Sequence, residues 1–185
     1  MQHADITVLG GLALPLLAAH LLADHPFQLS AWAAAKGGCD HSGRIACAKH
    51  VAVVAIAQGL AVLLVLAATG LAVDPLAFVA FVVFTVWSHY WFDRRFTAAG
   101  LYEAIGKTGF ATLGTPRPGH DDAPHLGTGA YRMDQDWHHL WLAIGALMLA
   151  STGVLLAVLT VAATALMAAA ILASRAGRRT LAQQA

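Results

Sequence analysis

Three pairs of histidine and aspartate, whose members are four positions apart in the sequence, are the part of this chain best suited to chemistry. They are His20 with Asp24, His89 with Asp93, and Asp134 with His138. Residues four apart share one face of a helix, so the imidazole and the carboxylate of each pair can act together. A further histidine, His50, stands at the start of a long apolar block.

These residue types predict a divalent-metal site, because imidazole with carboxylate suits zinc, manganese or iron better than a metal that prefers thiolate. Each aspartate can ligate the ion or orient the histidine of its pair. We expect metal ligands at His20, Asp24, His50, His89, Asp93, Asp134 and His138. An aspartate would also serve as the general base of a catalytic reaction, and the candidates are Asp24, Asp93 and Asp134.

Two other interpretations of the same residues stay open. Ionisable groups near helix ends can pair with one another, so the set could be a polar clamp in a structural or partner-binding membrane protein. It could also belong to a small transporter of cations or protons. A transporter needs a polar path, yet residues 51–73 offer only Gln58 and Thr69 as polar side chains.

The composition indicates where these pairs must be placed. Of 185 residues, 58% are hydrophobic and 11% are charged, whereas soluble domains carry ~25% charged residues. A soluble domain of this size could not cover so much apolar surface. A net charge of +1 also excludes a typical nucleic-acid-binding protein. We expect an all-α fold, a polytopic transmembrane helical bundle of four to five spans, as a single membrane domain over residues 1–185.

The apolar blocks define the expected spans. They lie near residues 6–24, 48–72, 75–93, 137–151 and 154–174, with loops at 25–47 and 94–136. Residues 140–173 carry no charge, and as one helix they would be about 51 Å long against a hydrocarbon core of ~30 Å. We therefore favour a tight hairpin near residues 151–153, which gives five spans. One steeply tilted helix would give four.

The distribution of lysine and arginine predicts the orientation of the bundle. Basic residues occur in both predicted loops and in the C-terminal tail, but not before Lys36 or in the turn at Asp74. The positive-inside rule therefore places the loops and the C-terminus in the cytoplasm and the N-terminus outside. Alternating spans then bring all the helix ends that carry histidine and aspartate to the cytoplasmic interface.

Several motifs also follow one another in a characteristic order. These are LLAAHLLADHPFQ at residues 16–28, Trp32, Lys36, His50, SHYWFD at 88–93 and DQDWHH at 134–139. The series resembles the domain-of-unknown-function 3307 family of small bacterial and phage integral membrane proteins. The resemblance implies a multi-span helical protein of the bacterial inner (cytoplasmic) membrane, but no particular activity. The chain departs from the family pattern at His25 and in a longer segment between the last two motifs.

Together these features favour a metal-dependent hydrolase that acts on a membrane-associated substrate at the cytoplasmic interface. The lipid bilayer is the expected partner, and no nucleic acid is expected. The loop contains a second polar group that could form another metal group or a lid, or simply a solvated loop. Its members are His120, Asp121, Asp122 and His125.

Overall fold

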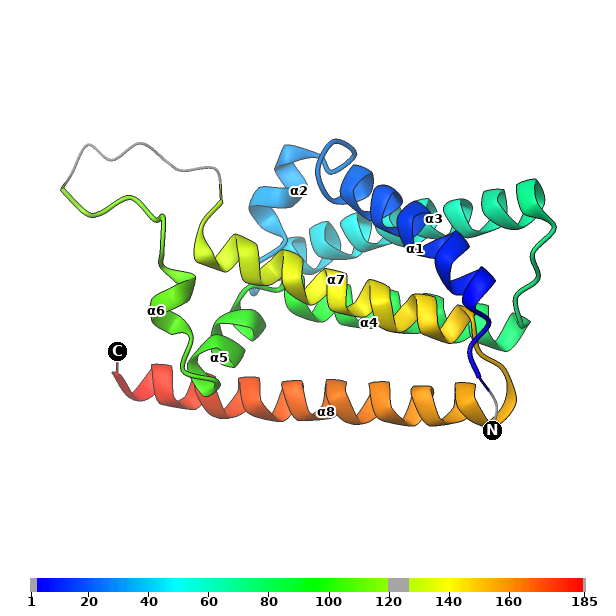
Figure 1. Cartoon of the computed structure of the whole chain (residues 1–185). Coiled ribbons are helices and arrows are strands. Elements are labelled where there is room, and N and C mark those ends of the chain that lie inside the picture. Colours follow the sequence, from blue (N-terminus) through cyan, green and yellow to red (C-terminus); the bar gives the residue numbers. More distant parts are fainter. Residues whose placement is uncertain (1–2, 120–126, 185) are drawn as a thin grey trace.

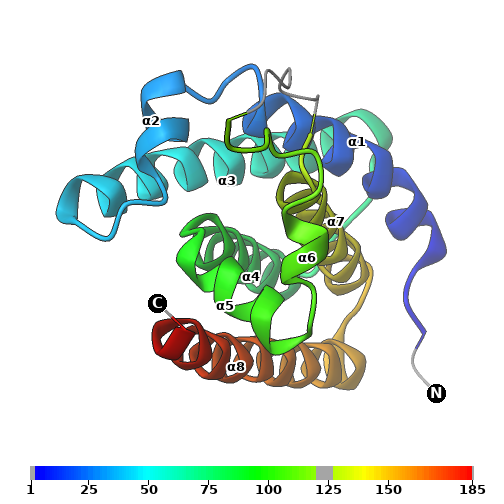
Figure 2. The same ribbon diagram turned by 90° about the vertical axis from the view of Figure 1, so that its left-hand side faces the viewer.

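The structure is a computed structural model that describes residues 3–119 and 127–184. All regular structure within these residues is helical, which confirms the expected all-α class. Five long helices alternate in direction (Figure 1): α1 (Ile6–Asp24), α3 (His41–Thr69), α4 (Pro75–Asp93), α7 (Gly129–Leu149) and α8 (Gly153–Gln184). The short helices α2 (Ser30–Ala35), α5 (Phe96–Ala104) and α6 (Thr108–Ala111) gather at the end where α1 and α4 finish (Figure 2).

Local capping signals fix where several of the long helices begin. Asp5 precedes α1 and accepts hydrogen bonds from the backbone of Thr7 and Val8. Asp74 caps α4 in the same way, and Thr128 accepts from the backbone N–H of Tyr131 at the start of α7. Such side chains satisfy N–H groups that have no partner within the helix. The positions of the helices that carry the histidines are therefore set by short sequence signals.

The long apolar block of residues 140–173 is divided between two helices. Helix α7 ends at Leu149 and α8 begins at Gly153, whose φ of 53° is in the left-handed region that glycine tolerates. Within the described residues, the helices long and apolar enough to cross a membrane are α1, α3, α4 and α8. Helix α7 carries polar residues in its first turns, so a fifth crossing through α7 stays a prediction.

Apolar side chains cover the outer faces of these helices. Leu14, Leu64, Leu76, Val154 and Val161 each keep at least 68% of their surface exposed. A monomeric soluble protein rarely presents so many large apolar side chains along every helix. These faces are suited to lipid.

Close packing joins α5 to the C-terminal part of α8. A Cβ added at Gly177 would lie 1.9 Å from the backbone oxygen of Gly100, so only glycine allows this approach. The hydroxyl of Ser174 donates a hydrogen bond of 2.6 Å to the backbone oxygen of Thr97. Helix α8 thus continues past the predicted span limit of residue 174 and supports α5 beside the polar end of the bundle.

Candidate metal centre

The three His/Asp pairs and His50 converge at the end of the bundle that α2, α5 and α6 surround. His20 and Asp24 lie in the last turns of α1, His89 and Asp93 in the last turns of α4, and His138 in α7. Six of the seven predicted ligands are at most 6% exposed, namely His20, Asp24, His50, His89, Asp93 and His138. Four helices far apart in the chain therefore contribute to one buried polar cluster.

The closest grouping in this cluster involves two histidines and two aspartates. The Nε2 atom of His50 lies 3.0 Å from Oδ1 of Asp24 and 3.1 Å from Oδ2 of Asp93. For Nε2 of His89 the distances to the same oxygens are 3.6 Å and 3.3 Å, and the two Nε2 atoms are 3.0 Å apart. Zinc bonds of about 2.0–2.1 Å place tetrahedral ligands about 3.3 Å from one another. Each of these five separations is compatible with two ligands of one ion.

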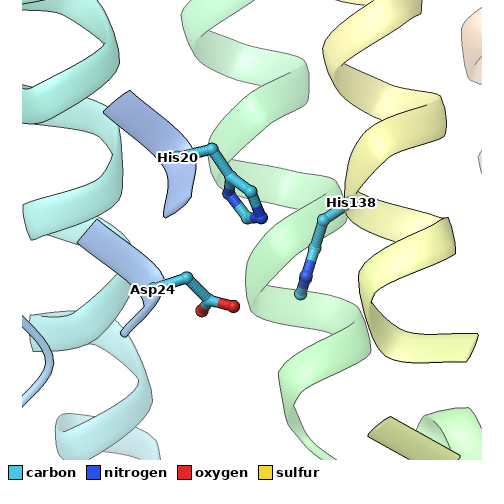
Figure 3. Close-up of side chains that lie close together, drawn as sticks. All are labelled: His20, Asp24 and His138. Atoms are coloured by element: carbon cyan, nitrogen blue, oxygen red, sulfur yellow. The ribbon is translucent and has the colours of Figure 1, made fainter. Parts of the chain in front are cut away.

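A second grouping lies beside the first and shares Asp24 with it. Figure 3 shows His20 and Asp24 on α1 pointing toward the ring of His138 on α7, and one donor atom from each lies within 4.8 Å of the others. Both ring nitrogens of His20 and of His138 are buried with no hydrogen-bond partner among the described residues. Buried polar atoms without partners are costly. An ion that accepts a lone pair from each ring would remove that cost.

Asp134 occupies a different place from the other six predicted ligands. Its Oδ2 is 3.6 Å from Nδ1 of His138, which is too long for a hydrogen bond, and its side chain keeps 25% exposure. It belongs to none of the donor groups found within the described residues. Asp134 precedes the predicted span of α7, and burial, reinforced by the Asp93 carboxylate, raises the pKa of its carboxyl group.

Two further residues contact the cluster, and the spacing of histidines and aspartates alone did not indicate either. Lys36, just after α2, places Nζ 2.9 Å from Oδ1 of Asp93. Gln135 donates a hydrogen bond of 2.7 Å from Nε2 to Oδ2 of Asp24. Both residues belong to the motifs quoted above, so motif membership was the available signal.

The charges in this cluster are unbalanced. Burial alone would lower the pKa of Lys36, but Asp93 and Asp24 outweigh burial and raise it, so Lys36 is an ammonium ion. Against this cation stand the buried carboxylates of Asp24 and Asp93. With neutral imidazoles these two carboxylates exceed the ammonium by one charge, and unbalanced buried charge is unfavourable. A bound cation would offset it.

Comparison with known proteins assigns the chain to a family. The family model described as Protein of unknown function (DUF3307) matches residues 12–168. The chain belongs to this family. The match confirms the resemblance inferred from the motifs, and it includes every predicted site residue of this DUF3307 protein from His20 to His138. No curated protein and no solved structure matches the chain.

A cavity of about 720 Å³ adjoins the candidate centre of this DUF3307 protein. The carboxylates of Asp24, Asp93 and Asp134 all lie on its wall, together with Lys36 and Gln135. Pockets of this size accommodate small-molecule ligands. The second polar group expected in the loop, His120, Asp121, Asp122 and His125, lies outside the described residues.

Proposed function

We propose that this DUF3307 protein is a metal-dependent hydrolase whose centre lies at the cytoplasmic face of the bacterial inner membrane. The observation that supports this most directly is that the Nε2 atoms of His50 and His89 are 3.0 Å apart and each lies 3.0–3.6 Å from an oxygen of Asp24 and an oxygen of Asp93. Zinc, manganese or iron fits this mixture of imidazole and carboxylate. The cavity beside the carboxylates offers room for a substrate.

Each residue of the cluster has a role in this proposal. His50, His89, Asp24 and Asp93 hold the ion, and His20 and His138 complete the coordination or hold a second ion through Asp24. A bound divalent ion lowers the pKa of a coordinated water. Asp134 faces the cavity outside the donor groups, and its raised pKa suits a group that accepts a proton near neutral pH.

Two alternatives receive less support from the geometry. A structural clamp would use its histidines as hydrogen-bond donors and acceptors, and His50 and His89 lie close enough to Asp24 and Asp93 for that role. The rings of His20 and His138, however, have no such partner among the described residues. A transporter would need polar side chains along α3, where Gln58 already accepts a hydrogen bond from Thr85. From residue 59 to residue 68, α3 carries no polar side chain.

Metal analysis of the purified protein tests the proposal. We expect at least one divalent ion per wild-type chain by plasma mass spectrometry, and its loss in His89→Ala. His41→Ala is the matched control, because His41 is an exposed histidine at the start of α3. Equal and low metal content in the wild type and in His89→Ala would refute the metal centre. A hydrolase further predicts that activity on phosphate or carboxylic esters is lost together with the metal.

A further inference from the structure

The cavity beside the centre has two chemically different walls. One wall comes from the ends of α1 and α4, from α7 and from the residues around α2. It carries the three carboxylates, Lys36, Arg95 and Gln135. Charged groups therefore concentrate on the side of the cavity that contains the candidate metal ligands.

The opposite wall is formed by α5, α6 and α8 and has no charged side chain. Its apolar members are Ala98, Ala99, Tyr102, Ala111 and Leu181, and Thr108 and Thr112 complete it. Phe92 also lines the cavity, and its ring packs against that of Tyr102 with the ring centroids 6.0 Å apart. An apolar wall is notable here because α5 and α6, two of the helices that form it, follow the last turn of α4 and belong to the predicted loop rather than to a predicted span.

Two cations, Lys36 and Arg95, also line the cavity. Lys36 pairs with Asp93, and Arg95 donates a hydrogen bond of 2.8 Å from Nη2 to the backbone oxygen of Ala33. Arg95 has a φ of 48°, the one positive value for a non-glycine residue in the described parts of the chain. Such a conformation costs free energy and persists where surrounding contacts enforce it. The fold thus holds the Arg95 side chain on the cavity wall, against Ala33 and Gly37, the residue after Lys36.

We infer that the cavity binds an amphiphile, specifically a phosphate ester on an apolar chain, as the substrate class of the proposed hydrolase. Phosphate oxygens would meet the ion, Lys36 and Arg95, since ammonium and guanidinium groups pair strongly with phosphate. The apolar chain would lie along α5, α6 and α8. This inference rests on the proposed metal centre.

The corresponding reaction is a simple hydrolysis. The oxygen of water forms a bond to phosphorus while the bond from phosphorus to the chain-bearing oxygen breaks. One proton of the water passes to a base, for which Asp134 is placed on the cavity wall, and then to the leaving oxygen, which departs as an alcohol; the other proton stays on the released phosphate. No oxidant, reductant or co-substrate other than water is required.

Binding of a non-hydrolysable probe tests the inference. Decylphosphonate, methylphosphonate and decanol are titrated into the metal-loaded full chain in nanodiscs of neutral lipid. Burial of only two methylene groups is worth about tenfold in affinity. We therefore expect decylphosphonate to bind at least about tenfold more tightly than either comparison compound. Equal affinity for decylphosphonate and methylphosphonate would show that only the headgroup is bound, and would overturn the inference.

A substitution on the apolar wall sharpens the test. Ala99 is exposed, lies on α5 and lines the cavity, whereas Ala104 is exposed on the same helix and does not line it. We expect Ala99→Trp to weaken decylphosphonate binding about tenfold or more, with metal content and methylphosphonate affinity unchanged. Ala111→Trp, on α6, should do the same, and Ala104→Trp should leave all three unchanged.

Metal analysis of the same samples separates the two proposals. Unchanged decylphosphonate affinity in both cavity variants, with metal present, would refute the amphiphile site and leave the metal centre standing. A wild-type protein without metal would refute the proposed function and this inference with it.

Discussion

The Nε2 atoms of His50 and His89 lie 3.0 Å apart, although the two residues belong to different helices and are 39 positions apart in the chain. Both atoms also lie within 3.3 Å of the same carboxylate oxygen of Asp93. Two ring nitrogens at this distance need either a proton or a cation between them. A metal ion satisfies both nitrogens and the carboxylate at once, which leads to the first prediction.

Removal of the ion should destabilise the wild-type protein. A ligand present at about 1,000 times its Kd stabilises the folded state by about 4 kcal/mol, so a chelator should lower the Tm by on the order of 10 °C. His50→Ala should have the lower Tm from the start and should not respond to the chelator, as measured by differential scanning fluorimetry. His41→Ala should respond like the wild type. A chelator that leaves the wild-type Tm unchanged would contradict the prediction.

Substitution of Lys36 should have an effect that depends on metal. The side chains of Lys36 and Asp93 are only 11% and 1% exposed, and breaking a buried pair by removal of one partner costs about 3–5 kcal/mol. We expect Lys36→Met to lose stability of this order without metal and less with metal, because the ion then neutralises Asp93. Chemical unfolding under both conditions measures the difference.

The control for this prediction is Lys49→Met, since Lys49 is exposed on α3. Its stability should stay within about 0.5 kcal/mol of the wild type. If the loss in Lys36→Met were the same with and without metal, Lys36 would stabilise the fold independently of the centre.

Gln135 should act as a positioning residue for the Asp24 carboxylate. Its Nε2 donates to Asp24 at 2.7 Å and to Asp134 at 3.3 Å. Loss of such an outer partner typically weakens metal affinity by about 10–100-fold. We expect Gln135→Met to raise the metal Kd by this factor while the number of bound ions per chain is unchanged. Gln183→Met, at an exposed position near the end of α8, is the control; a lower stoichiometry in Gln135→Met would point to unfolding instead.

Five crossings would place the C-terminus in the cytoplasm. Green fluorescent protein fused after residue 185 should then fluoresce, and alkaline phosphatase fused there should be inactive. A phosphatase fusion in the turn at Asp74 should be active, because that turn is predicted to lie outside. The opposite result at the C-terminus alone would indicate four crossings.

The sequence could predict the convergence of the histidines because it depends on two simple regularities. Four-residue spacing on a helix keeps His20 and Asp24 on one face, and alternation of long helices brings their ends together. The class of fold followed from composition. Helix α7 begins at Gly129, earlier than the predicted span at 137. The sequence signal for this earlier start is the capping residue Thr128.

Contacts that depend on the path of a loop could not be predicted in this way. Lys36 reaches Asp93 because residues 25–40 fold back onto the end of α4, where the guanidinium group of Arg94 also contacts the backbone oxygen of Gly38. The separation of Asp134 from the donor groups could not be predicted either. Asp134 and His138 lie one turn apart on α7, yet only His138 belongs to a donor group. Spacing places residues on a face but does not give their distance from a common point.

The scattered origin of the donor atoms has a consequence for biosynthesis. The first ligand is residue 20 and the last is residue 138, so no partly synthesised chain that lacks α7 contains the complete set. The group that the proposed function assigns to the ion, Asp24, His50, His89 and Asp93, comes entirely from α1, α3 and α4, whereas the grouping of His20 and Asp24 with His138 needs α7. An ion held as proposed could therefore be loaded once α4 has joined the bundle, and the arrival of α7 would then close the site from the side of His138.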